Sequence, residues 1–406
     1  MREKILAYVK KEFLPLFVLI LVLLGMAGTS YLYQRAHTYA ESYPELKEVT
    51  GTNWSFQKYS TYFQQLADKK GAMYAYGVLR QVELPPVIDL HLLAHIVGDM
   101  LYKQKGLAGM KECTDEFRNA CSHSVVIGYL REFGEGSLPE IAKTCKQAPG
   151  GRGAYTMCFH GLGHGVLAYT GYDLEKAVAM CKRTGTAEYN NREYIECAGG
   201  AVMEMTVGVH DRGVWEGQAP KYFIKGDPLS PCNADFMSPE VRPICYMHLT
   251  PELLKAAGSD LGILNPETFP TAMGYCEAIP KDDVEDRRAC FGGFGKEYIM
   301  LASGHDIRDL GLTTEPGLRL MRAACAATPN VEGEANCNES ALNSLYWGGE
   351  NTPDASFTYC QIAEGAAQAT CYAQLAGNIS YYLAGTEKGR LQCAQLPNEY
   401  RAACTR

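Results

Sequence analysis

Along most of the chain, hydrophobic residues recur three or four positions apart, the spacing that lines one face of an α-helix. This pattern is clear over 56–69, 71–82 and 87–104. Two further stretches, 174–180 and 318–324, each run directly into a cysteine. The pattern predicts an all-α fold.

Residues 13–33 differ from the rest because they are apolar throughout and carry no charge. A helix of that length spans roughly 31 Å, enough to cross a bilayer core. Four Lys or Arg residues precede the segment, whereas Arg35 alone follows it immediately, which places the N-terminus in the cytoplasm. We therefore predict a cytoplasmic stub and signal-anchor over 1–34. A cleaved signal peptide is the alternative, since residues 27–29 are small.

This topology has consequences for location and partners. It predicts a single-pass protein with the membrane as a partner and an extracytoplasmic main domain. A periplasm, a cell exterior and a secretory lumen all fit that prediction.

The cysteines alternate between short and long gaps along the chain. Taken as sequential pairs, the two cysteines of a pair are 8 to 16 positions apart, and the step from one pair to the next is 22 to 35 positions. Sequence alone does not give disulfide connectivity, but this alternation favours eight local bridges over any other scheme. The pairs are 113 with 121, 145 with 158, 181 with 197, 232 with 245, 276 with 290, 325 with 337, 360 with 371, and 393 with 404.

Each pair lies inside the same order of elements: a helix, the first cysteine, a short connection, the second cysteine and another helix. The units repeat every 32 to 51 residues between first cysteines, a period typical of an α-solenoid. One bridge per hairpin would limit fraying in an array whose units contact only their neighbours. We predict about eight disulfide-locked hairpins over 113–406, forming an α-solenoid or a nearly closed α/α ring. A spacer at 35–50 and an N-terminal helical cap at 51–112 precede them.

Residues 113–404 resemble the disulfide-rich, Sel-one-like class of helical repeats, which are related to tetratricopeptide repeats. The segment Cys113-Thr-Asp-Glu-Phe-Arg-Asn-Ala-Cys121 has the short cysteine spacing of that class. Gly165-Val166, followed by Asp173-Leu-Glu-Lys-Ala-Val178, is similar to its glycine turn and first helix. The resemblance implies extracytoplasmic protein–protein recognition rather than one particular chemistry. We therefore predict a protein or a small-molecule ligand as the partner.

Composition narrows the class of protein further. Of the 406 residues, 47% are hydrophobic and 21% are charged, a balance that excludes wholesale disorder. A net charge of −8 with no basic block argues against nucleic acid as a partner. The 16 cysteines fit an oxidising compartment, where paired thiols persist.

Five of the nine histidines lie within 74 residues, where a uniform scatter would put between one and two. His91 and His95 are one helical turn apart, and His160 and His164 repeat that spacing. His123 follows Cys121 by two residues, as His160 follows Cys158, so the two occupy equivalent positions in adjacent hairpins. These five histidines are candidate ligands for zinc, iron or copper, all of which accept nitrogen donors.

A carboxylate accompanies this histidine cluster. Glu204 lies seven residues after Cys197, close to the repeat position of His164, and Glu297 repeats that position two units later. Beside a metal with an open coordination position, Glu204 could act as a general base on bound water.

A structural role for the histidines is the alternative. Asp99, four residues after His95, could satisfy that imidazole without a metal. The zinc-protease signature is absent, because Leu92 and Gly161 stand where its glutamate belongs. His210 and His305, each followed by Asp, are expected to serve turn hydrogen bonding at helix ends.

Two functions therefore remain open. The leading prediction is a membrane-anchored recognition or scaffold protein that acts through a concave surface. The alternative is a metal-dependent enzyme, a hydrolase or an oxidoreductase, or a metal-binding protein that uses the histidine cluster.

Overall fold

The structure is a computed structural model, and it describes residues 43–85, 88–149, 151–208, 210–259, 265–302, 307–308, 310–347 and 351–404. All regular structure in these ranges is helical, with no strand, so the all-α prediction is confirmed. The chain divides into two units, Met1–Thr50 and Gly51–Arg406. Within the first unit, the described residues include one short helix, α2 (Leu46–Val49). Everything below concerns the second unit.

Three helices precede the first cysteine pair: α3 (Phe56–Lys70), α4 (Ala72–Gln81) and α5 (Leu90–Lys105). The side chain of Asp89 starts α5 by accepting a hydrogen bond from the backbone N–H of Leu92, which would otherwise lack a partner. Ser55 starts α3 in the same way. A 3₁₀ segment, η1 (Gly106–Glu112), then leads to Cys113.

Eight disulfides join the cysteines in sequential pairs, and no cysteine is free, so the predicted pairing is confirmed. The second cysteine of every pair lies on an α-helix. The first does so in five pairs, whereas Cys113, Cys232 and Cys276 lie in irregular or 3₁₀ segments. The predicted helix–cysteine–helix order therefore holds only in part. The helices of this region are α6 (Ala120–Phe133), α7 (Leu138–Cys145), α8 (Gly151–Tyr169), α9 (Leu174–Cys181), α10 (Arg192–Val207), α11 (Arg212–Gln218), α12 (Arg242–His248), α13 (Thr250–Ala256), α14 (Phe269–Gly274), α15 (Val284–Ala302), α16 (Glu315–Ala326), α17 (Val331–Tyr346), α18 (Asp354–Gln361), α19 (Gly365–Leu383), α20 (Glu387–Gln395) and α21 (Asn398–Cys404).

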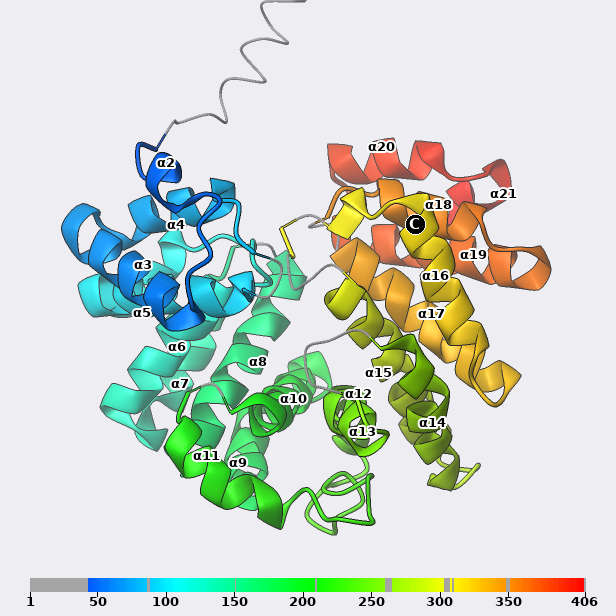
Figure 1. The fold of residues 1–406 in the computed structure, drawn as a ribbon, viewed down its shortest axis with the longest axis horizontal. Coiled ribbons are helices and arrows are strands. Elements are labelled where there is room, and N and C mark those ends of the chain that lie inside the picture. Colours follow the sequence, from blue (N-terminus) through cyan, green and yellow to red (C-terminus); the bar gives the residue numbers. More distant parts are fainter. Residues whose placement is uncertain are drawn as a thin grey trace, which may run out of the picture. The chain divides into compact units, whose positions relative to one another are not determined.

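One series of helices packs in the order of the sequence (Figure 1). Each member contacts the next along the series α5, α6, α8, α10, α12, α15, α17 and α19. Other helices lie beside neighbouring members: α9 contacts α8 and α10, and α16 contacts α15 and α17. The residues that follow the second cysteines therefore lie on helices that touch one another, which positions the site described below.

Helices α8 and α10 pack backbone against backbone because glycines face each other at the contact. A Cβ atom on Gly163 would lie 2.0 Å from the carbonyl oxygen of Cys197, and one on Gly200 would lie 1.9 Å from that of His160. No side chain other than hydrogen fits at such a distance. The glycines of α8, unfavourable for helix formation on their own, thus serve close packing.

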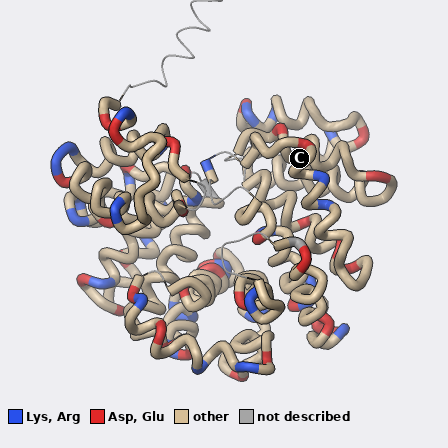
Figure 2. Tube along the Cα trace, viewed as in Figure 1, with Lys and Arg blue, Asp and Glu red and all other residues tan. Residues whose placement is uncertain are grey.

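Segments far apart in the sequence also meet within this unit. Helix α19 contacts α8. The guanidinium of Arg118 lies 4.0 Å from the ring centroid of Trp347, and the Arg308 guanidinium donates to the carbonyl oxygen of Val82. Segments between Arg308 and α19 therefore contact segments between Val82 and α8. Acidic and basic residues are intermixed along the described chain (Figure 2).

The predicted membrane topology is not supported. Among the described residues, no helix is both long and apolar enough to span a membrane. The longest, α8, α15 and α19 with 19 residues each, all carry polar or charged residues and pack among other helices. The predicted anchor at 13–33 lies outside the described residues. The single-pass topology, and with it the membrane as a partner, is therefore withdrawn.

Candidate metal centre

Seven imidazoles gather where the first helices of the packed series meet. The side chains come from α5 (His91, His95), α6 (His123), α8 (His160, His164), the segment before α11 (His210) and the end of α12 (His248). Ring centroids of neighbouring members lie 4.6 to 6.4 Å apart. All five histidines singled out in the sequence belong to this cluster, and Glu204 on α10 borders it.

Two helix contacts make room for the cluster. A Cβ atom on Gly161 would lie 2.4 Å from the ring of His123, so the missing side chain leaves space for that imidazole between α6 and α8. A Cβ atom on Gly98 would lie 2.7 Å from that of Ser124, so a glycine there lets α5 approach the serine that orients His95. Small residues thus set the spacing of the ring-bearing helices.

His91, His95 and His123 form a first set of donor atoms, all within 4.8 Å of one another. The Nδ1 atom of His91 lies 2.8 Å from the carbonyl oxygen of Phe117, which can only accept, so Nδ1 carries the hydrogen. The hydroxyl of Ser124 donates its hydrogen to the carbonyl oxygen of His95 at 2.8 Å. It therefore accepts from the Nδ1–H of His95 at 3.2 Å.

These hydrogen bonds leave two lone pairs facing each other. In the neutral imidazoles, Nε2 of His91 and Nε2 of His95 both lack hydrogen, yet they lie 3.1 Å apart. Within the described residues, neither ring nitrogen of the buried His123 has a hydrogen-bond partner. Buried polar atoms are rarely left in this state, and a cation between them would satisfy all three rings.

The electrostatics keep these rings neutral. Burial lowers the pKa of His91, His95 and His123, and the neighbouring imidazoles lower it further. A metal ion requires the neutral ring as its ligand. The set is therefore in the protonation state that binds metal at neutral pH.

His164, Glu204 and His210 form a second set, also within 4.8 Å. Oε2 of Glu204 lies 3.1 Å from Nδ1 of His164 and 2.8 Å from Nδ1 of His210. Oε1 accepts from the Tyr172 hydroxyl at 2.6 Å and from the backbone N–H of His210 at 2.9 Å. Burial would raise the pKa of Glu204, but these imidazoles hold it well below its usual range, and burial lowers the pKa of His164 to about 4.

Two imidazoles of the cluster belong to neither set. Nδ1 of His160 lies 3.7 Å from Oε2 of Glu196, beyond hydrogen-bond distance. Nδ1 of His248 lies 3.1 Å from Nζ of Lys296. Burial lowers the pKa of Lys296 to about 8. His160, predicted as a ligand, thus lies within the cluster but belongs to neither donor set.

The structure also corrects several expectations about the partners of individual residues. Nδ1 of His95 bonds to Ser124 rather than to Asp99, so the proposed metal-free partner is not the one observed. Asp211 caps α11 as a turn residue, but His210 beside it faces Glu204 instead. Sequence reasoning missed His210 and His248 as cluster members. Glu297 belongs to neither donor set, and His305 lies outside the described residues.

Comparison of the chain with protein-family models, with curated proteins and with solved structures finds no significant match. The function is therefore inferred from the geometry of the cluster.

Proposed function

We propose that this protein binds a transition-metal dication through His91, His95 and His123. The proposal rests on the Nε2 atoms of His91 and His95, which lie 3.1 Å apart. Neither atom carries a hydrogen, because the hydrogen of each neutral ring is on Nδ1, where it is donated to Phe117 or Ser124. An added proton could bridge them, but burial and the adjacent imidazoles disfavour a charged ring there. A metal ion bonded to each nitrogen at about 2.1 Å fits the same approach.

The donor chemistry narrows the choice of metal. Three imidazoles suit zinc, copper or iron, whereas magnesium and calcium prefer oxygen ligands. A three-histidine set also leaves coordination positions open for water or a substrate, as in catalytic rather than structural sites. A metal-dependent enzyme is therefore the form of the proposal with most support. Glu204 as its general base remains a prediction, since both of its oxygens already accept hydrogen bonds.

The architecture and compartment belong to the same proposal. Sequential packing of the hairpin helices supports an α-solenoid or nearly closed α/α ring of the tetratricopeptide-like kind. Eight disulfides support an oxidising compartment. Recognition of a protein or small-molecule ligand through a concave surface remains a second, untested prediction.

Elemental analysis of protein purified without a histidine tag tests the proposal. We expect the wild type to retain zinc, copper or iron in at least stoichiometric amount. His91→Asn and His95→Asn keep a donor near the position of Nδ1 but lack Nε2, so each should lose the metal of this set. His248→Gln is the matched control, because His248 is a buried histidine of the same cluster outside the donor set. Wild-type protein that neither retains nor takes up any of these metals would contradict the proposal.

A further inference from the structure

We propose that His164, Glu204 and His210 bind a second metal ion, so that the cluster is a two-ion centre. This inference rests on the proposed function and adds to it a site that includes His210, a residue with no metal role in the sequence-based prediction. The second ion would again be a transition-metal dication, here with one carboxylate among its ligands.

The two carboxylate oxygens of Glu204 have different kinds of hydrogen-bond partner. Oε1 is held by an O–H and a backbone N–H, which remain donors whether or not a metal is present. Oε2 faces only the Nδ1 atoms of the two histidines. Ligand atoms around one tetrahedral ion with bonds of about 2.1 Å lie about 3.4 Å apart, close to the separations of 3.1 and 2.8 Å seen here. Oε2 and its two partners thus have the spacing of a shared ion.

The charge of Glu204 also favours a cation beside it. Glu204 is fully buried, and among the described residues its only ion-pair partners are these two imidazoles, with no Lys or Arg in reach. A buried carboxylate without a cation is costly. A dication bound by Oε2 would supply the missing positive charge.

One ring nitrogen of His164 also lacks a hydrogen-bond partner. Nε2 of His164 is buried and, within the described part of the chain, has no hydrogen-bond partner. While Nδ1 donates to Glu204, the lone pair of this ring is on Nε2 and faces no donor. Because Nε2 takes part in no hydrogen bond, the ring hydrogen can shift to it and leave the Nδ1 lone pair for an ion shared with Oε2 of Glu204.

The two donor sets are neighbours. The ring of His95 lies 5.9 Å from that of His210 and 6.4 Å from that of His164, centroid to centroid. The His123 and His164 rings are 6.3 Å apart. Two bound ions would thus be close enough for magnetic coupling, and the Glu204 carboxylate would offset part of their repulsion.

The test uses the full-length protein, stripped of metal with a chelator and titrated with Co²⁺ or Cu²⁺, with bound metal counted by elemental analysis. Wild-type protein should bind two equivalents and show spin coupling in the paramagnetic spectrum. His210→Asn and Glu204→Gln should each bind one equivalent and lose the coupling, and His91→Asn should bind one in the other set. His248→Gln should still bind two.

The outcomes separate this inference from the proposed function. One equivalent in the wild type, lost in His91→Asn and unchanged in His210→Asn, would overturn the second site and leave the first. Two equivalents in Glu204→Gln would also overturn it, because the carboxylate would then only orient the histidines. No binding at all would contradict both proposals. Circular dichroism of every variant confirms that it is folded.

Discussion

At the scale of single residues, the hydrogen bonds behind the rings determine which nitrogen faces the cluster. Phe117, whose carbonyl holds His91, lies in a run of three residues with positive φ that continues through Arg118 and Asn119. Such backbone is strained for residues other than glycine and is typical of functional sites. Ser124 orients the ring of His95 in the way that Phe117 orients His91, but through its side-chain hydroxyl. The supporting residues therefore matter as much as the imidazoles.

Ser124→Ala should weaken metal binding without abolishing it. The change removes the acceptor for Nδ1 of His95, so the ring can rotate and change tautomer. Loss of such a supporting hydrogen bond typically lowers metal affinity about 10- to 100-fold. Competition with a chromophoric chelator measures the affinity. Ser122→Ala is the control, since within the described residues its buried hydroxyl bonds only to the carbonyl oxygen of Asn119. Equal affinities in the two variants would contradict the role given to Ser124.

Gly161→Ala should disrupt the first donor set. The new methyl group would lie 2.4 Å from the His123 ring and 2.6 Å from its Cα atom, so α6 and α8 would have to separate. Overpacking of this kind costs about 1–3 kcal/mol of unfolding free energy, and the metal of the set should be lost with it. Chemical denaturation and elemental analysis measure the two effects. Gly153→Ala, on the same helix and 3.5 Å from its nearest neighbour, should be tolerated; similar losses in both variants would argue against a specific clash.

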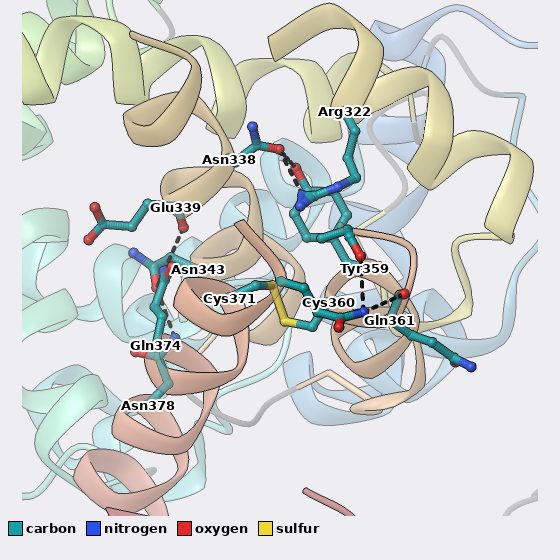
Figure 3. Close-up of a disulfide and its surroundings, with 12 residues drawn as sticks. Arg322, Asn338, Glu339, Asn343, Tyr359, Cys360, Gln361, Cys371, Gln374 and Asn378 are labelled. Atoms are coloured by element: carbon teal, nitrogen blue, oxygen red, sulfur yellow. Dashed lines mark hydrogen bonds between the residues drawn. A yellow bond between two sulfur atoms is a disulfide. The ribbon is translucent and has the colours of Figure 1, made fainter. Parts of the chain in front are cut away.

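At the scale of elements, a disulfide joins the two helices of a hairpin, and hydrogen bonds join these helices to a neighbouring one. Figure 3 shows Cys360 of α18 joined to Cys371 of α19. Gln374, one turn further along α19, donates to Oδ1 of Asn343 on α17 at 2.9 Å. Tyr359, beside Cys360 on α18, donates to Asn338 on α17. The bridge thus joins α18 to α19, and the polar contacts join each of these two helices to α17.

Replacing both cysteines of this pair by serine should lower stability while leaving metal binding intact. A bridge that closes a loop of this length contributes up to roughly 3 kcal/mol by constraining the unfolded chain. The expected result is a lower thermal midpoint with unchanged metal content, because α18 and α19 supply no residue of the cluster. Differential scanning calorimetry and elemental analysis check the two parts. An unchanged midpoint would show that the polar contacts of Figure 3 suffice to hold this hairpin.

The sequence predicts features that are determined by residues close together along the chain, but not features that depend on contacts between distant segments. Cysteine spacing predicts all eight bridges, because each closes a short loop. The same repeat frame aligns His123 with His160, and the structure brings both into one cluster. His210 could not be predicted in this way, since its position depends on the turn at Gly208 and on a hydrogen bond to Glu204. The orientation of His95 depends on a serine of another helix, which no periodicity indicates.

At the scale of the second unit, residues far along the sequence pack against a segment that orients a histidine of the cluster. The ring of Trp347 at the end of α17 covers the guanidinium of Arg118. Arg118 follows Phe117, whose carbonyl orients His91. No repeat pattern predicts this contact, because it joins a segment before α6 to one after α17 and depends on the path of all the helices between them.

The contact between Arg118 and Trp347 should therefore affect both stability and the metal centre. A buried cation–π pair contributes about 0.5–2 kcal/mol, so a double-mutant cycle with Arg118→Met and Trp347→Leu should give a coupling energy in that range. Trp347→Leu should also weaken metal binding, because it removes the ring that covers the turn behind His91. Val331→Leu, a change at an 82% exposed side chain at the other end of α17, provides the control. A coupling energy near zero together with unchanged metal affinity would mean that the last hairpins fold beside the site without supporting it.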